Sequence, residues 1–201
     1  MTQSTIIFSP SPHMHTGRTT PMAMYHVLIA LLPAVACALY FFGLPALGVL
    51  VTSVAACVAT EWAITRFMLR RPTTVFDGSA LLTGVLLALN LPSNLPLWMV
   101  AAGAVMAIGI AKMAFGGLGC NIFNPALVGR VFLLISFPVA MTTWPVPLQP
   151  DGITGPTILG LEKLDSLDPG QVEISHLLTG DIGGSMGEVS AIALIIGFIY
   201  L

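Results

Sequence analysis

Charged side chains are scarce in this chain. Asp, Glu, Lys and Arg together make up 8% of its 201 residues, and the formal net charge is −2. Soluble domains usually carry about 25% charged residues, so most of the surface is expected to face lipid or other apolar protein. The weak net charge gives no support to a nucleic-acid-binding function, which needs a basic surface.

Cysteine is also rare, and the three cysteines, Cys37, Cys57 and Cys120, lie far apart. They cannot supply the four thiolates of an iron–sulfur cluster, and their spacing has no zinc pattern, so no metal site is predicted. Cys37 and Cys57 fall within apolar runs and are expected to be small core residues. The sequence also lacks the Gly-x-Gly-x-x-Gly loop that typically binds a nicotinamide dinucleotide.

Long apolar runs dominate the chain, with 56% hydrophobic residues and a mean hydropathy of +0.92. A helix needs about 20 apolar residues to cross the hydrocarbon of a bilayer. The runs near this length are residues 24–42, 46–67, 97–115, 126–144 and 186–201. The run at 77–91 is shorter and is closed by Pro92. The sequence therefore predicts an all-α polytopic membrane protein of about six hydrophobic helices, including short or half helices.

Four segments are expected along the chain. Residues 1–23 form a cytoplasmic N-terminal segment; they lack the basic start and apolar core of a signal peptide, so the first apolar run is expected to remain as a span. Residues 24–144 form a membrane domain of about five helices, with a tight turn at 43–45 that makes a helical hairpin. Residues 145–185 form an outer-side loop, and residues 186–201 form a last helix that we expect to be truncated.

Basic residues set the expected orientation, because cytoplasmic loops of membrane proteins carry an excess of Lys and Arg. With a cytoplasmic N-terminus, the basic residues of the first four runs and their connections fall on the cytoplasmic side: Arg18, Arg66, Arg70, Arg71 and Lys112. The acidic segment 145–185, whose only Lys or Arg is Lys163, then lies outside.

Ionisable residues within apolar runs are costly and are commonly functional or paired. Glu61 lies late in the second run and Arg130 early in the fifth. Both have side chains long enough to reach the cytoplasmic face, or they line a cation route or contact a cofactor. Asp77, just before the short run, either caps a helix or takes part in the same ion path.

The polar stretch Asp151-Gly152-Ile153-Thr154-Gly155-Pro156-Thr157 stands out in the acidic segment. Asp-Gly and Gly-Pro are turn-forming pairs, so one interpretation is an ordinary loop between two spans. The other interpretation is a binding segment. The hydroxyls of Thr154 and Thr157 flank a glycine, and this glycine allows another molecule to approach closely.

Two short segments resemble each other. Asp77-Gly78-Ser79-Ala80 and Glu188-Val189-Ser190-Ala191 each place an acid two residues before Ser-Ala at the start of an apolar run. Glycine-interrupted helices in corresponding positions are typical of inverted repeats that enclose a site. The match is short, and chance explains it equally well.

The stretch 151–157 also resembles the Asp-x-x-Thr/Ser-Gly-Ala-Thr signature of the membrane subunits of the Rnf and sodium-pumping NADH:quinone oxidoreductase complexes, with Pro156 in place of the usual Ala. Further blocks are similar to the family of the Rnf membrane protein RnfD, in the family's order: residues 11–13 (Ser-Pro-His), 77–84, 115–130 and 137–144.

This resemblance implies an inverted-repeat membrane protein, similar in fold to urea transporters, of which this chain is the first half. It implies FMN joined covalently to Thr157 through a phosphoester by a flavin transferase, with Asp151, Thr154 and Gly155 completing the motif and Thr154 as the second choice of acceptor. It further implies a multi-pass protein of a bacterial or archaeal cytoplasmic membrane, with the flavin on the outer side. A non-covalent riboflavin site in the family would involve residues beyond this chain.

The resemblance also implies a role as one subunit of an oxidoreductase that couples electron transfer between ferredoxin and NAD to Na⁺ or H⁺ translocation. Because the chain has neither a cluster-forming cysteine set nor a dinucleotide loop, its electrons must come from other flavin and iron–sulfur subunits, and no catalytic residue is assigned to it. The alternative from the residues alone is a channel or transporter subunit for a small solute or ion, because such proteins also contain half-length helices.

Overall fold

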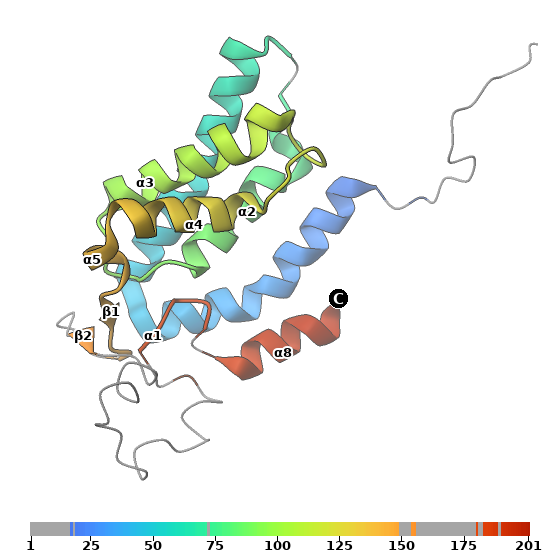
Figure 1. Cartoon of the computed structure of the whole chain (residues 1–201). Coiled ribbons are helices and arrows are strands. Elements are labelled where there is room, and N and C mark those ends of the chain that lie inside the picture. Colours follow the sequence, from blue (N-terminus) through green and yellow to red (C-terminus); the bar gives the residue numbers. More distant parts are fainter. Residues whose placement is uncertain are drawn as a thin grey trace, which may run out of the picture.

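The computed structural model describes residues 17, 19–71, 73–148, 154–155, 180, 183–188 and 190–201 (Figure 1). These residues are mainly helical, and two stretches are long and apolar enough to cross a bilayer, Thr20–Met68 and Leu97–Phe115. Shorter apolar helices accompany them. The fold is that of a polytopic membrane protein, as the composition predicts.

Helix α1 (Thr20–Ala63) contains the first two predicted spans, and a π-helical turn, Ile64–Met68, extends it. Gly43 interrupts it with φ 62° and ψ −140°, a conformation that side chains with a Cβ rarely adopt. Figure 1 shows the two arms of α1 leaving this part of the chain in different directions. The predicted hairpin turn is therefore confirmed, but it consists of Gly43 alone, because Pro45 has a φ compatible with the first turn of a new helix.

The short run folds as a half-length helix, α2 (Ser79–Leu89), preceded by a 3₁₀ turn at Val75–Asp77. The run at 97–115 is a single helical stretch that begins as α3 (Leu97–Val105). It continues as a π-helical segment, Met106–Lys112, and ends in a 3₁₀ turn, Met113–Phe115. Glycines at 116, 117 and 119 with positive φ then turn the chain.

The predicted fifth span over 126–144 is wrong in one respect, because it is not a continuous helix. Helix α4 (Pro125–Ser136) begins at a proline, and the side-chain carbonyl oxygen of Asn124 accepts a bond from the amide of Ala126. Phe137 has φ −135° and ψ 59° and ends the helix. A residue that precedes a proline is driven out of the helical region by the ring, and here that proline starts the one-turn helix α5 (Pro138–Met141).

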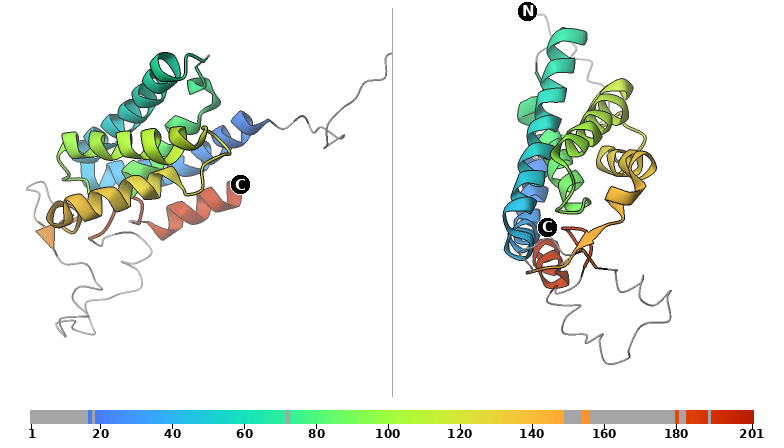
Figure 2. Two further views of the ribbon diagram at one scale, coloured as in Figure 1. Left: turned by 45° about the horizontal axis from the view of Figure 1, so that its top comes forward. Right: turned by 90° about the vertical axis from the view of Figure 1, so that its left-hand side faces the viewer.

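A small antiparallel ladder departs from the predicted all-α fold. Strands β1 (Trp144–Pro145) and β2 (Thr154–Gly155) pair with Trp144 opposite Gly155. The ladder lies at one end of the bundle, and the beginning of α1 lies at the opposite end (Figures 1 and 2). The ladder therefore joins the residues before 149–153 to the residues after them, at this end of the bundle.

Helix α8 (Ala191–Tyr200) forms the last described element and packs beside the first arm of α1. The predicted run began at 186, but residues 186–188 instead form a turn that docks on the end of α2: the amide of Gly187 donates to the Leu89 carbonyl at 2.7 Å. The resemblance between 77–80 and 188–191 persists in part, since Ser79 is the first residue of α2 and Ser190 caps α8. The acids differ, because Glu188 accepts from the amide of Ser185.

Glycines bring the helices of the core into close contact. A Cβ at Gly84 of α2 would lie 2.7 Å from the Cα of Val54, and one at Gly103 of α3 would lie 2.5 Å from the Cδ1 of Leu133. Gly103 thus serves packing within the chain. Gly109 differs, since a Cβ there would meet its nearest atom at 3.7 Å. Cys57 is fully buried in this core, as expected, whereas Cys37 is partly buried and Cys120 is exposed.

Candidate functional site

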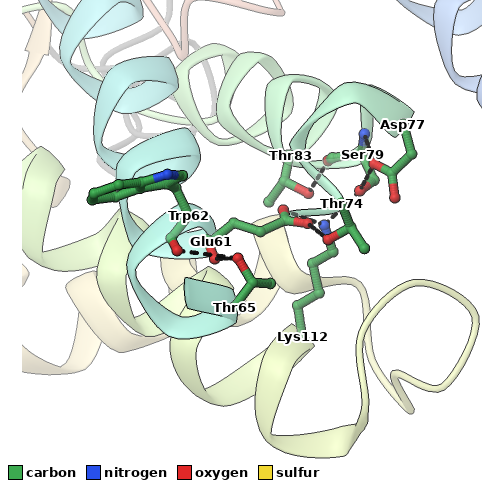
Figure 3. A network of polar contacts seen from close by, with 8 residues as sticks. All are labelled: Glu61, Trp62, Thr65, Thr74, Asp77, Ser79, Thr83 and Lys112. Carbon is green, nitrogen blue, oxygen red and sulfur yellow. Dashed lines mark hydrogen bonds and ion pairs between the residues drawn. The ribbon is translucent and has the colours of Figure 1, made fainter. Parts of the chain in front are cut away.

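A buried ion pair joins two of the apolar stretches. Lys112 Nζ donates to Glu61 Oε2 at 2.6 Å, and the two side chains are 3% and 1% exposed. Lys112 comes from the π-helical segment after α3, and Glu61 comes from the last turns of α1 (Figure 3). Neither side chain reaches an aqueous face. Of the two expectations for Glu61, extension to the cytoplasmic surface is therefore wrong. Lys112 is likewise not a free cytoplasmic charge.

Ser79 at the start of α2 extends this pair into a relay. Lys112 Nζ also donates to Ser79 Oγ at 2.5 Å. The Ser79 hydroxyl donates in turn to Asp77 Oδ1 at 2.5 Å, and the Ser79 amide donates to the same oxygen at 2.9 Å. Asp77 thus satisfies one of the N–H groups that the first turn of a helix leaves free, which is the predicted capping role. It is partly buried, so the relay runs from the interior toward the protein surface.

Threonine hydroxyls complete the surroundings of the pair. Thr74 Oγ1 donates to Glu61 Oε1 at 2.7 Å, so both oxygens of this carboxylate have a partner. Thr65 and Thr83 donate to backbone carbonyls one helical turn earlier, that of Glu61 and that of Ser79 respectively. Figure 3 shows the side chains of three separate elements converging on one point. Polar groups in a low-dielectric interior need this degree of satisfaction to be tolerated.

The charge of this cluster is not balanced. Two carboxylates, Glu61 and Asp77, are linked through hydrogen bonds to one ammonium, that of Lys112. With all three groups ionised, one negative charge is left over. A single added monovalent cation or proton would neutralise it. The buried pair of Glu61 and Lys112 is neutral by itself, and the extra negative charge belongs to Asp77, which is only partly buried. The arrangement can therefore hold or pass one positive charge.

A cavity of about 270 Å³ lies beside the cluster. Its wall includes Ser79, Thr83 and Lys112 from the network, together with Asn121 and Asn124 from the turn before α4. The polar side of the cavity thus faces the relay. Among the described residues no group of three or more His, Cys, Asp or Glu side chains is arranged to hold a metal ion, so the cluster is not a metal centre of that kind.

Arg130 lies apart from this cluster. Its Nη1 donates to Asn90 Oδ1 at 2.9 Å, and the Asn90 side-chain amide donates to the Leu86 carbonyl, so Asn90 caps the carboxyl end of α2 and Arg130 is held beside it. A cation there complements the negative end of the helix dipole. The structure therefore brings together two of the three predicted ion-path residues, Glu61 and Asp77, and separates the third.

The predicted flavin motif is only partly within the described residues. Thr154 is exposed and Gly155 is partly buried in β2, next to β1. Asp151 and Thr157 lie outside the described residues, as does most of the acidic segment. The two sets of predicted site residues are not neighbours. The ladder lies at one end of the bundle, whereas the polar network lies around the last turns of α1, at the far end of its second arm (Figures 1 and 3).

Sequence reasoning missed Lys112 and Ser79 as members of the cluster. The available signal was the cost of burying a carboxylate: a Glu at position 61 within an apolar run calls for a basic partner in another run. Within the later apolar runs, only Lys112 and Arg130 carry the required charge. The sequence alone does not say which of them faces Glu61.

Comparison with known proteins gives consistent results. The chain is 46% identical over 204 residues to the D subunit of the Na⁺-translocating ferredoxin:NAD⁺ oxidoreductase complex of Acetobacterium woodii, covering 100% of this chain and 63% of the relative. It is 42% identical to the D subunit of the proton-translocating ferredoxin:NAD⁺ oxidoreductase complex of Clostridium ljungdahlii, with 96% and 61% covered. It is 38% identical to the D subunit of the ion-translocating oxidoreductase complex of Stutzerimonas stutzeri, with 89% and 59% covered.

The chain thus spans about three fifths of the length of these relatives. The model of the NQR2, RnfD, RnfE family matches residues 7–201, which is nearly the whole sequence. Both findings agree with the blocks of resemblance at 77–84, 115–130 and 137–144. The chain belongs to the NQR2, RnfD, RnfE family.

Proposed function

We propose that this chain is the flavin-carrying membrane subunit of a redox-driven ion pump that transfers electrons between ferredoxin and NAD and couples this to Na⁺ or H⁺ translocation. The observation that carries the proposal is the match of nearly the whole chain to a family whose relatives include the D subunits of such complexes. As one subunit of a translocase, it is inactive alone.

Thr157 is the proposed acceptor of FMN, through a phosphoester bond made by a flavin transferase. Asp151, Thr154 and Gly155 complete the recognition motif, and Thr154 is the second choice of acceptor. The described part of the motif fits this role, because the Thr154 side chain is exposed beside β1. A transferase needs such access. Bound FMN would accept and pass on electrons, while the protein sets its position and potential.

Flavin attachment is tested on the complex purified from its native host. We expect in-gel fluorescence under ultraviolet light after denaturation, and peptide mass spectrometry should find the FMN adduct on the fragment with Thr157. Thr157→Ala should abolish the adduct, whereas Thr154→Ser, which keeps the motif, should leave it on Thr157. An unmodified Thr157 in the native protein would overturn the proposal. An adduct that moves to Thr154 would reassign the acceptor.

Partners follow from what the chain lacks. It has no cysteine set for a cluster, so other flavin and iron–sulfur subunits must deliver and remove its electrons. We place it in the cytoplasmic membrane of a bacterium or archaeon, with the flavin loop on the outer side. Purification in mild detergent should co-isolate subunits with iron–sulfur and flavin absorbance. A lone, flavin-free chain that conducts a solute in liposomes would favour the channel alternative instead.

The cluster of Glu61, Lys112, Ser79 and Asp77 is the proposed part of the ion path within this chain. The support is its formal net charge of −1 and its route from a buried carboxylate, Glu61, to a partly exposed one, Asp77. Ionisable groups inside a bilayer commonly line such routes. Arg130 has a different role in this proposal, since its described contact is with the side chain of Asn90 at the end of α2.

A further inference from the structure

Three arginines gather where the second arm of α1 ends, at the top of Figure 1. Arg66 lies in the π-helical turn Ile64–Met68, and Arg70 and Arg71 come just after it. All three side chains are exposed. In the described part of the chain, none of the three guanidinium groups has a carboxylate within ion-pair distance. The cluster therefore presents three positive charges that no described side chain neutralises.

The backbone of this turn keeps the three arginines together. The amide of Leu69 donates to the Ile64 carbonyl at 2.9 Å. The amide of Arg71 donates to the Thr65 carbonyl at 3.1 Å. The second bond reaches two residues further back than an α-helical bond does, so it folds Arg71 onto the end of α1. The three side chains therefore start from one turn of the chain, and they are long enough to reach a common ligand.

Arg70 occupies a backbone position that favours a different residue. Its φ is 49°, in the left-handed region. Helices commonly end with one residue in this conformation, usually Gly and sometimes Asn, because a Cβ is unfavourable there. The Arg70 side chain is exposed, so packing does not account for an arginine here. Its charge is the property that remains to explain it.

The end of the helix needs much less positive charge than it has. The carboxyl end of a helix dipole is equivalent to about half a negative charge. Asp77 follows in the same connection, and its carboxylate already accepts two bonds from Ser79. If the dipole and Asp77 are both set against the three arginines, roughly one and a half positive charges remain. The positive-inside bias explains the side on which this turn lies, but it does not provide a partner for the remaining charge.

The position of the cluster along α1 corresponds to the lipid headgroups. A helix rises about 1.5 Å per residue, so about 20 residues after the corner at Gly43 cross the roughly 30 Å of hydrocarbon. The boundary then falls near Ala63, and a headgroup layer of about 5–7 Å holds the turn that follows. Trp62 is 48% exposed, and its ring meets that of Phe67 edge to face at 5.5 Å. Exposed tryptophan is enriched at this depth of a membrane.

We propose that Arg66, Arg70 and Arg71 bind the phosphate of an anionic phospholipid, whose acyl chains contact the apolar side chains between these arginines. Guanidinium groups match phosphate in geometry and bind it in a bidentate manner. Phe67 is 67% exposed and Met68 is 76% exposed. Apolar side chains interleaved with arginines favour a ligand that is charged at one end and apolar at the other, rather than the acidic surface of a soluble protein. The proposal requires only that the chain lies in a membrane, so it is independent of flavin attachment.

The test is photocrosslinking in the assembled complex, reconstituted in vesicles of phosphatidylcholine with a minor fraction of phosphatidylglycerol. A benzophenone amino acid replaces Met68, and mass spectrometry identifies the molecule that it captures. We expect phosphatidylglycerol in excess of its fraction in the vesicles. The same amino acid in place of Leu44 is the matched control, because Leu44 is 81% exposed at the other end of this arm of α1. It should capture the two lipids in their bulk ratio.

Arg70→Asn separates the charge from the backbone, because Asn is tolerated in the left-handed region and Arg66 and Arg71 remain to orient the chain. A basic group near an anionic surface contributes about 1 kcal/mol, which is a factor of about five. Arg70→Asn should therefore lower the ratio of phosphatidylglycerol to phosphatidylcholine captured at position 68 about fivefold. Arg70→Lys keeps the charge and should retain most of the excess.

Three outcomes would overturn the proposal. The first is capture of the two lipids at position 68 in their bulk ratio when all three arginines are present. The second is an excess of phosphatidylglycerol that Arg70→Asn leaves unchanged. The third is capture of a neighbouring subunit in place of lipid, which would make this turn a protein interface.

Discussion

Glu61 and Lys112 form an ion pair of 2.6 Å between residues 51 positions apart, with both side chains almost fully buried. The pair fastens the end of α1 to the stretch 97–115, and Ser79 adds the start of α2. Three elements thus share one polar contact inside an apolar protein. A buried pair of this kind contributes little net stability but is costly to break.

Lys112→Met should destabilise the chain by about 3–5 kcal/mol, because it leaves the Glu61 carboxylate buried without its cation. The double variant Glu61→Leu/Lys112→Met should recover most of this loss, since apolar residues of similar volume replace the pair. The measurement is the thermal unfolding midpoint of the purified complex in detergent. Equal or additive losses in the double variant would show that the pair is not the source of the effect.

Ser79→Ala should interrupt the relay between Lys112 and Asp77. We expect electron transfer through the complex to persist while ion translocation per electron falls, because the buried charge loses its connection to the surface. The measurement compares ion uptake with electron-transfer rate in the same vesicles. Ser53→Ala is the matched control: Ser53 is also fully buried and donates to the Gly84 carbonyl at 2.8 Å, outside the relay. A reduced coupling ratio in both variants would argue against the relay.

Much of the helical layout is predictable from the sequence, because length and hydropathy constrain membrane helices strongly. The short run at 77–91 and the span at 97–115 are confirmed as α2 and as the stretch that begins with α3. The continuous span over 126–144 is wrong because hydropathy does not register backbone geometry. Phe137 before Pro138 ends α4 even though the apolar character continues.

The site was less predictable than the fold. Sequence reasoning identified Glu61 and Asp77 as unusual for their position, but pairing depends on which helix faces which. Gly84 against Val54 sets how closely α2 approaches α1, while Ser79 of α2 bonds to Lys112 of the stretch 97–115. Such contacts depend on tertiary packing, which one sequence does not encode in any local pattern. The β1–β2 ladder was missed for the same reason, because it joins residues on either side of a turn-rich segment.

Gly84→Ala should destabilise the protein by about 1–3 kcal/mol, which is typical of overpacking a close contact. The added Cβ would lie 2.7 Å from the Cα of Val54, and backbone cannot move aside as a side chain can. Gly109→Ala is the control, because its Cβ would meet only Ile64 Cδ1 at 3.7 Å. It should be neutral or slightly stabilising, since Ala favours helix over Gly. Thermal unfolding midpoints of the two variants decide the matter, and equal losses would contradict this packing.

The orientation of the chain can be tested with one native cysteine and one introduced cysteine. Cys120 is exposed in the turn after the stretch that contains Lys112, and this turn lies at the opposite end of the bundle from β1 and β2 (Figures 1 and 2). With a cytoplasmic N-terminus, a membrane-impermeant maleimide should label Cys120 in inverted vesicles only. Cys120→Ser should remove that signal.

Asp165→Cys in the Cys120→Ser background should then be labelled in right-side-out vesicles, because the predicted acidic loop lies outside. The positive-inside distribution of Arg66, Arg70 and Arg71 is the physical reason for this orientation. Since Lys112 is buried in its ion pair, it adds nothing to the charge of the cytoplasmic loops. Arg66, Arg70 and Arg71 should therefore suffice, and the double variant Glu61→Leu/Lys112→Met should keep the same labelling pattern. Labelling of Asp165→Cys only from the cytoplasmic side would reverse the orientation and place the flavin motif inside.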